Sequence, residues 1–291
     1  MKGIILAGGS GTRLYPATKV ISKQIIPIYD KPMIYYPLSV LMMGGIKDIL
    51  IITAPESIGM FQDLLQDGSQ WGISFTFIVQ PKPEGLAQAF ILGKDFIGND
   101  NVTLILGDNI FWGHEFPKII RRGIERKEGA TIFLYWVHDP ERYGVAAFNA
   151  QGKVVDLEEK PKKPKSNYAV TGLYCYDHHV SEYASTLKPS ARGELEITDL
   201  NKIYLAKDQL NSQILGRGVA WLDTGTHEAM LQASHFIGTI QERQGLLIAS
   251  PEEVAFRMGY ITQEELLSHG ESMKKNSYGS TLIRIAQEKM C

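Results

Sequence analysis

Two aspartates in this sequence each follow a short apolar run and could bind a metal ion. The run Leu-Ile-Leu-Gly precedes Asp108, and the segment Trp-Leu-Asp-Thr-Gly-Thr contains Asp223. Open α/β sheets bind ligands beyond the carboxyl ends of their strands, which is where these carboxylates are expected. Proteins usually hold Mg²⁺ with one or two carboxylates beside substrate phosphates. Asp108 and Asp223 are therefore candidate Mg²⁺ ligands, although each alone could be a turn or helix-capping residue.

A glycine-rich segment, Leu-Ala-Gly-Gly-Ser-Gly-Thr-Arg-Leu-Tyr-Pro, follows the first apolar run of the chain. Glycines allow backbone amides to turn inward, so such a loop can bind phosphates. The third glycine of a dinucleotide fingerprint would fall at Leu14, and no Gly-Lys-Ser/Thr closes a P-loop. This spacing disfavours an NAD-dependent oxidoreductase. Two interpretations of the segment remain, a phosphate-binding loop and a plain strand-to-helix turn.

Basic residues follow the glycines and could neutralise a polyphosphate. Arg13, Lys19 and Lys23 bring three cations to the same part of the chain. Cations are needed where negative charge develops on a leaving polyphosphate. The alternative is a set of solvated basic side chains.

Residues that suit a sugar phosphate lie in the middle of the chain. Lys160, which precedes Pro161, could bind a phosphate, and Glu159 could accept hydrogen bonds from sugar hydroxyls. The alternative is that Glu159 and Lys160 are simply solvated residues at the end of a strand, which is more common for charged side chains. Arg192 is a further candidate phosphate contact, with a helix cap or an ion pair as alternatives.

A glutamine after the third apolar run could read a base. The amide of Gln80 offers both a donor and an acceptor to the edge of a pyrimidine, and Gly85 would admit the base close to the backbone. The alternative for Gln80 is an ordinary polar loop residue.

The glycine-rich segment Gly8-Gly9-x-Gly11-Thr12-Arg13-Leu14-x-Pro16, with Lys23-Gln24 and Pro27 after it, resembles the sugar nucleotidylyltransferases. The resemblance extends over almost the whole chain and is strongest to the thymidine-specific members. It implies magnesium binding by Asp108 and Asp223 and catalytic roles for Arg13, Lys23 and Lys160. It implies nucleotide contacts by Gly8, Gly9, Gly11, Thr12, Arg13, Lys23, Gln24, Gln80, Gly85 and Asp108. It implies sugar-phosphate contacts by Tyr143, Gly144, Glu159, Lys160, Val170, Gly172, Arg192 and Trp221.

The resemblance also implies a reaction. An Mg²⁺-dependent, in-line transfer of dTMP from dTTP to α-D-glucose 1-phosphate would give dTDP-glucose and pyrophosphate, the first step toward dTDP-deoxysugars such as dTDP-rhamnose. A homotetramer and feedback inhibition by a downstream dTDP-sugar are implied as well. UTP or another hexose phosphate as substrate stays open, as does a non-catalytic regulatory subunit, although the presence of all the catalytic residues argues against the latter.

The composition excludes several classes of protein. The chain has 291 residues, of which 44% are hydrophobic, and 30 basic residues nearly balance 32 acidic ones. No excess positive charge is available to bind a nucleic acid. The two cysteines, Cys175 and Cys291, suit a reducing compartment. The apolar run at the N-terminus is too short for a signal peptide or a membrane span. We expect a cytoplasmic protein without a membrane segment.

The order of apolar patterns predicts the fold. Period-2 or continuous apolar runs predict strands at 2–6, 48–53, 73–79, 102–106, 130–137, 144–148, 154–157 and 169–176. Helical spacing predicts helices at 33–44, 57–65, 84–96, 180–187, 197–207 and 226–243, and three short ones after Pro251. The expected fold is a Rossmann-like α/β arrangement, with a mixed, mainly parallel central sheet flanked by helices and a helical C-terminal appendage.

This order also suggests a division of labour along the chain. Residues 1–240 are expected to form the nucleotidyltransferase domain, with nucleotide binding in about 1–110 and sugar-phosphate binding in about 111–240. Residues 241–291 are expected to form a helical segment that contributes an interface.

Overall fold

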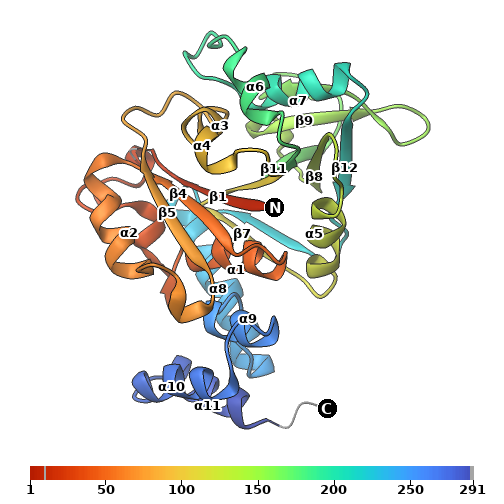
Figure 1. Ribbon diagram of the computed structural model, residues 1–291. Helices are drawn as coiled ribbons and strands as arrows, with labels where there is room; N and C mark the ends of the chain where they lie inside the picture. Colours follow the sequence, from red (N-terminus) through yellow and green to blue (C-terminus); the bar gives the residue numbers. More distant parts are fainter. Residues whose placement is uncertain (10, 289–291) are drawn as a thin grey trace.

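The computed structural model describes residues 1–9 and 11–288. Ser10 of the glycine-rich segment and Cys291 therefore lie outside the described residues. Within them, the centre of the molecule is a nine-stranded mixed sheet with helices on both faces (Figure 1). The predicted fold class is confirmed.

The first half of the sheet is parallel and holds the glycine-rich segment. Its strands lie in the order β6-β1-β4-β5. They are β1 (Lys2–Ala7), β4 (Asp48–Thr53), β5 (Ser74–Val79) and β6 (Val102–Leu106). Their carboxyl ends share one edge, so the segments that follow β1, β5 and β6 are brought together there.

The second half of the sheet is mostly antiparallel and adjoins the first through β11 (Tyr168–Tyr176), which pairs with β6. The other strands are β8 (Ala130–Trp136), β9 (Gly144–Phe148), β10 (Val154–Glu159) and β12 (Leu210–Ile214). β9 and β8 both pair with β11, and β10 and β12 continue the sheet from them. The predicted site residues of the middle of the chain thus share a sheet with the glycine-rich segment.

Buried side chains alternate between the two faces of the sheet. In β1, Ile4 and Leu6 pack on one face, whereas Ile5 and Ala7 pack on the other. Covering helices are α1 (Tyr35–Met43), α2 (Ile58–Leu65), α3 (Gln88–Leu92), α4 (Lys94–Ile97), α5 (Phe116–Ile124), α6 (Val180–Ser185) and α7 (Ile197–Ala206). Burial on both faces explains why the parallel strands read as nearly continuous apolar runs.

Helices end the chain, as predicted. The long α8 (His227–Gln244) is followed by α9 (Pro251–Arg257), α10 (Gln263–Ser272) and α11 (Ser277–Gln287). α9 packs against α1, and the last two helices lie together at one end of the molecule (Figure 1). A capping box starts α10, in which the Thr262 hydroxyl accepts from the N–H of Glu265 and the Glu265 carboxylate accepts from the N–H of Thr262.

One predicted helix differs from the structure, and some strands, β12 among them, were not predicted. The single helix predicted for residues 84–96 is wrong, because the helical part begins only at Gln88 and is divided at Gly93. Pro81, Pro83 and Gly85, whose φ is 107°, keep the preceding segment irregular. Two small ladders were also not predicted: β2 (Pro27–Ile28) with β3 (Lys31–Pro32), and β7 (Asn109–Trp112) with β13 (Ala220–Asp223).

Among the described helices, none is long and apolar enough to cross a membrane.

Candidate functional site

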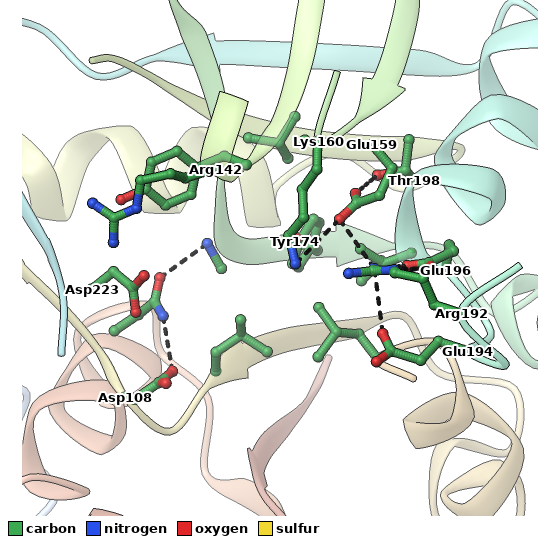
Figure 2. A pocket seen from close by; sticks show the side chains of 18 of the residues that line it. Asp108, Arg142, Glu159, Lys160, Tyr174, Arg192, Glu194, Glu196, Thr198 and Asp223 are labelled. Carbon is green, nitrogen blue, oxygen red and sulfur yellow. Dashed lines mark hydrogen bonds and ion pairs between the residues drawn. The ribbon is translucent and has the colours of Figure 1, made fainter. Parts of the chain in front are cut away.

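A cavity of about 500 Å³ lies beside the carboxyl ends of β6, β10 and β13 and the middle of β11 (Figure 2). From the predicted set it is lined by Arg13, Asp108, Tyr143, Gly144, Glu159, Lys160, Val170, Gly172, Arg192, Trp221 and Asp223. In Figure 2 the two aspartates lie at one end of the cavity and Arg192 at the other, with Lys160 between them. The structure therefore brings the candidate metal ligands and the candidate sugar-phosphate residues to one place.

The β7–β13 ladder brings the two aspartates together. Asp223 lies opposite Asn109 in this antiparallel pair, and Asp108 immediately precedes Asn109. The backbone N–H and the hydroxyl of Thr224 both donate to the carbonyl oxygen of Asp108, at 3.1 and 2.7 Å. Two carboxylates from distant parts of the sequence are thus fixed side by side.

The pKa values of Asp108 and Asp223 are shifted in opposite directions. Burial, and then the nearby charge of Asp108, raise the pKa of Asp223 above its ordinary value. Burial acts in the same direction on Asp108, but the ammonium of Lys23, with which it forms an ion pair, outweighs burial and holds the pKa of Asp108 below its ordinary value.

Two adjacent, partly buried carboxylates fit a divalent cation, which would relieve the repulsion between them. In the part of the chain that the structure describes, no group of three or more His, Cys, Asp or Glu side chains is arranged so that it could hold a metal ion. Magnesium needs no such cluster, because it keeps waters and substrate oxygens among its ligands. The donor set is therefore suited to Mg²⁺ held jointly by the protein and a phosphate.

Asn109 connects the aspartates to the sugar side of the cavity. Its buried side chain donates to Asp108 Oδ1 at 3.0 Å and accepts from Trp221 Nε1 at 2.6 Å and from the backbone N–H of Gly172 at 3.1 Å. Asn109 had no predicted role. Its partners in β11 and β13 are far away in the sequence, so only its position directly after Asp108 hinted at a function.

Glu159 and Lys160 lie at the end of β10, where the backbone conformation is unusual. Lys160 has a φ of 43°, which a lysine before a proline rarely adopts. Its N–H donates to Tyr143 O at 3.0 Å, and its ammonium lies 4.0 Å from Glu159. Glu159 also accepts from the hydroxyl of Thr198 at 2.5 Å, so the carboxylate is oriented toward the cavity that all three residues line.

Arg192 is engaged in ion pairs at the far end of the cavity. Its guanidinium forms a forked contact with Glu196, with Nε–Oε1 and Nη2–Oε2 distances of 3.1 and 2.8 Å, and lies 3.3 Å from Glu194. Burial favours the neutral form of Glu196, but Arg192 outweighs it and lowers the pKa of that carboxyl. The ion pair that was the alternative for Arg192 is thus present.

Arg142 is a further cation in the cavity and had no predicted role. It lies in the short 3₁₀ helix η5 (Pro140–Arg142) and donates to Asp139 at 2.8 Å. Its charge lowers the pKa of Asp223, against the larger effect of burial. Its neighbours Tyr143 and Gly144 had predicted roles, but the sequence could not show that the side chain of Arg142 also lines the cavity.

The glycine-rich segment borders a second, smaller cavity of about 180 Å³, which Gly9, Gly11, Lys19 and Lys23 line. Gly9 and Gly11 have φ values of 102° and 58°, which side chains other than glycine disfavour. The 3₁₀ helix η1 (Thr12–Leu14) follows and exposes Thr12 and Arg13. Loop and cations are therefore adjacent, as predicted.

The remaining predicted residues lie in the walls around the site. Gln24 is buried, and its side chain accepts from Ser22 Oγ at 2.6 Å. Gln80 lies directly over Gly8, where an added Cβ would be 2.0 Å from Gln80 Oε1. Gly85 packs on the backbone of Leu195, with 2.4 Å between an added Cβ and Leu195 O. None of these three lines the larger cavity among the residues described for it.

Comparisons with known proteins agree with this arrangement. The nucleotidyl transferase family matches residues 2–239. Glucose-1-phosphate thymidylyltransferase of Xanthomonas campestris pv. campestris is 59% identical, over 98% of this chain and 97% of its own length. The enzyme of the same name from Neisseria meningitidis is 58% identical, over 99% of this chain and 100% of its own.

A solved structure of UDP-glucose pyrophosphorylase complexed with UDP-glucose is also similar, with a TM-score of 0.72 at 25% identity, over 82% of this chain and 98% of that chain. Sequence, fold and the arrangement of the site agree, and this chain belongs to the nucleotidyl transferase family.

Proposed function

We propose that this enzyme transfers dTMP from dTTP to α-D-glucose 1-phosphate, giving dTDP-glucose and pyrophosphate. The observation that carries the proposal is the pairing of Asp108 with Asp223 at one end of a cavity that also contains Lys160 and Glu159. The names of the relatives that span nearly the whole chain support these two substrates.

The sugar phosphate would bind between the aspartates and the far end of the cavity. Glu159 would accept hydrogen bonds from sugar hydroxyls, while the Lys160 ammonium would hold the phosphate that attacks. Binding of both substrates in one fixed geometry removes much of the entropic barrier to the reaction. Arg192 would reach the phosphate only by exchanging one of its carboxylate partners.

The nucleotide would lie over the glycine-rich segment, with its base at Gln80 and Gly85. A phosphate oxygen of glucose 1-phosphate attacks the α-phosphorus of dTTP as the bond to pyrophosphate breaks. Arg13, Lys23 and the loop amides would receive the negative charge of the leaving group. The attacking phosphate is already anionic near neutrality, so the protein supplies no nucleophile. Mg²⁺ held by Asp108 and Asp223 would neutralise charge on the phosphates.

We further propose a division of roles and an assembly. Residues of about 1–110 would bind the nucleotide, about 111–240 the sugar phosphate, and the helical segment 241–291 would contribute to an interface. The resemblance to the sugar nucleotidylyltransferases supports a homotetramer and feedback inhibition by a dTDP-sugar. The apolar side chains of Trp136, Ile214 and Leu231 are exposed, which suits burial in a subunit interface. The free thiol of Cys175 suits the cytoplasm.

Pyrophosphate release tests the reaction. Purified protein is incubated with glucose 1-phosphate and one of dTTP, UTP, CTP, ATP or GTP, in the presence of either Mg²⁺ or EDTA. The rates of pyrophosphate release with the five triphosphates are then compared. We expect metal-dependent release that is fastest with dTTP. Preference for UTP would reassign the nucleotide and keep the mechanism, whereas no release with any triphosphate would contradict the proposal. Light scattering on a sizing column measures the assembly.

A further inference from the structure

A buried chain of hydrogen bonds leads away from Gln80 at the end of β5. Gln80 Nε2 donates to Gln88 Oε1 at 2.6 Å. Gln88 Nε2 in turn donates to Glu84 Oε2 at 2.8 Å, and Gln88 Oε1 also accepts from the backbone N–H of Glu84 at 3.1 Å. Gln80 is 4% exposed and Gln88 7% exposed, so water competes little with these bonds.

Glu84 determines which way both amides point. An amide side chain can be turned end for end, but a backbone N–H can only donate and an ionised carboxylate can only accept. Gln88 must therefore direct its oxygen to the Glu84 N–H and its NH₂ to the Glu84 carboxylate. Its oxygen then faces Gln80, so Gln80 must direct its NH₂ toward Gln88. The orientation of Gln80 follows from Glu84 through Gln88.

The backbone of Glu84 is itself held by Leu195, in the segment before α7. Its carbonyl oxygen accepts from the N–H of Leu195 at 2.6 Å, and Ala87 N–H donates to Leu195 O at 3.2 Å. Gly85, at a φ of 107°, lets the two backbones meet this closely. The Glu84 N–H is therefore fixed in position, which makes it a firm reference for the amides.

This arrangement leaves one acceptor for a base. Gln80 Oε1 lies over Gly8 of the phosphate loop, and among residues 1–9 and 11–288 no hydrogen bond to it is formed. Thymine and uracil present an N3–H donor beside a carbonyl, whereas cytosine presents an N3 acceptor beside an amino group. An amide held with its oxygen toward N3 suits the first pair, and the reversed amide suits cytosine.

We propose that Gln88 and Glu84 are positioning residues that make this enzyme reject cytosine nucleotides, because they fix the amide orientation of Gln80. The inference rests on the proposed function, in which Gln80 meets the base. The arrangement does not distinguish thymine from uracil, since both carry N3–H.

Three variants of this network differ in the expected ratio of kcat/KM with dTTP to kcat/KM with CTP. Gln88→Met removes the acceptor, frees Gln80 to turn, and is expected to lower the ratio by about tenfold or more. Gln88→Lys puts a donor in its place, pairs with Glu84, and is expected to lower the ratio further, because Gln80 must now direct its oxygen to the lysine. The double variant Glu84→Gln with Gln88→Glu keeps one carboxylate in the network and still presents an acceptor oxygen at position 88 to the NH₂ of Gln80. It is expected to have the wild-type ratio.

Two comparisons separate positioning from general damage. The ratio of dTTP to UTP is expected to stay within about twofold of wild type in all three variants, because N3–H is common to both bases. Gln70→Met, at a partly buried glutamine that donates to Leu65 O, is expected to leave both ratios unchanged. Circular dichroism checks that each variant is folded; should Gln88→Met not fold, Gln88→Lys and the double variant carry the same test.

A dTTP to CTP ratio that stays at the wild-type value in the folded Gln88 variants would overturn the inference while leaving the proposed function standing. Absence of turnover by the wild-type enzyme with every triphosphate would instead contradict the proposed function.

Discussion

Asp223 is the residue at which stability and activity are expected to oppose each other. Burial and the charge of Asp108 raise its pKa, so the folded state disfavours its ionised form. A carboxyl whose pKa is raised on folding stabilises the protein below its unfolded pKa, and loses that contribution as the pH rises through the folded pKa. In Mg²⁺-free buffer, Asp223→Asn is therefore expected to raise Tm near neutral pH. In assays with Mg²⁺, the same substitution is expected to abolish turnover.

Thermal melts from about pH 4 to about pH 8 measure this effect. The gain in Tm is expected to shrink toward acidic pH, where Asp223 of the wild type is protonated. Asp208→Asn is the control, because the exposed Asp208 pairs with Lys153, which lowers its pKa, and it lies away from the cavity. A lower Tm for Asp223→Asn near neutral pH would contradict the prediction.

Lys160 combines a functional ammonium with a strained backbone. Asparagine adopts the left-handed conformation more readily than lysine, so Lys160→Asn is expected to change the free energy of unfolding by less than about 0.5 kcal/mol. Loss of the ammonium is expected to lower kcat/KM by about 100-fold or more. Urea unfolding and steady-state kinetics measure the two quantities, and near-normal turnover would argue against phosphate binding by Lys160.

The sequence pointed to Asp108, Asp223 and Gln80 because each stands at the end of an apolar run, and to Lys160 because it precedes a proline. These patterns could not give the roles of Arg142 or Asn109. Those depend on which strand ends meet in space, and long-range pairing is not encoded in local periodicity.

At the level of elements, strands inside the sheet were the easiest to predict. β4 and β6 are buried on both faces and have the predicted bounds, because their apolar runs are short and rich in β-branched residues, which favours a buried strand over a helix. β7 and β13 are four residues each and mix polar with aromatic side chains, so neither has a usable pattern. The helix predicted from residue 84 onward begins too early. The prolines and the positive-φ glycine after Val79 keep the backbone irregular there, and this backbone hydrogen-bonds to Leu195 instead of forming a helical turn.

The connection between β1 and η1 gives a prediction about nucleotide binding. An added Cβ at Gly8 would lie 2.0 Å from Gln80 Oε1, so Gly8→Ala must displace that side chain. We expect KM for dTTP to rise by about tenfold while KM for glucose 1-phosphate changes little, because the sugar end of the cavity is not contacted. Gly216→Ala is the control, since Gly216 has open space around it and no positive φ, and it does not line the cavity. Equal changes in both KM values would contradict this separation.

At the scale of the whole molecule, the C-terminal helices belong to the same hydrophobic core as the sheet. Leu282 of α11 is fully buried in the cluster that also contains Ile5 of β1 and Leu41 of α1. Leu282→Ala is expected to lower the free energy of unfolding by about 2–5 kcal/mol. Val155→Ala, at a side chain that is 51% exposed, is expected to cost less than about 0.5 kcal/mol.

Urea unfolding followed by fluorescence measures both variants, and kcat of the folded enzyme is expected to stay normal. A small cost for Leu282→Ala would mean that the appendage packs independently of the sheet.

The β7–β13 ladder makes the site a late product of folding. It pairs residues more than a hundred positions apart, and such long loops close slowly. Helices, and the pairing of β4 with β1 and β5, form from closer neighbours, so they can exist before the two carboxylates meet. A chain under synthesis has no complete site until β13 has been made, and a refolding chain is expected to regain its helical signal before its turnover.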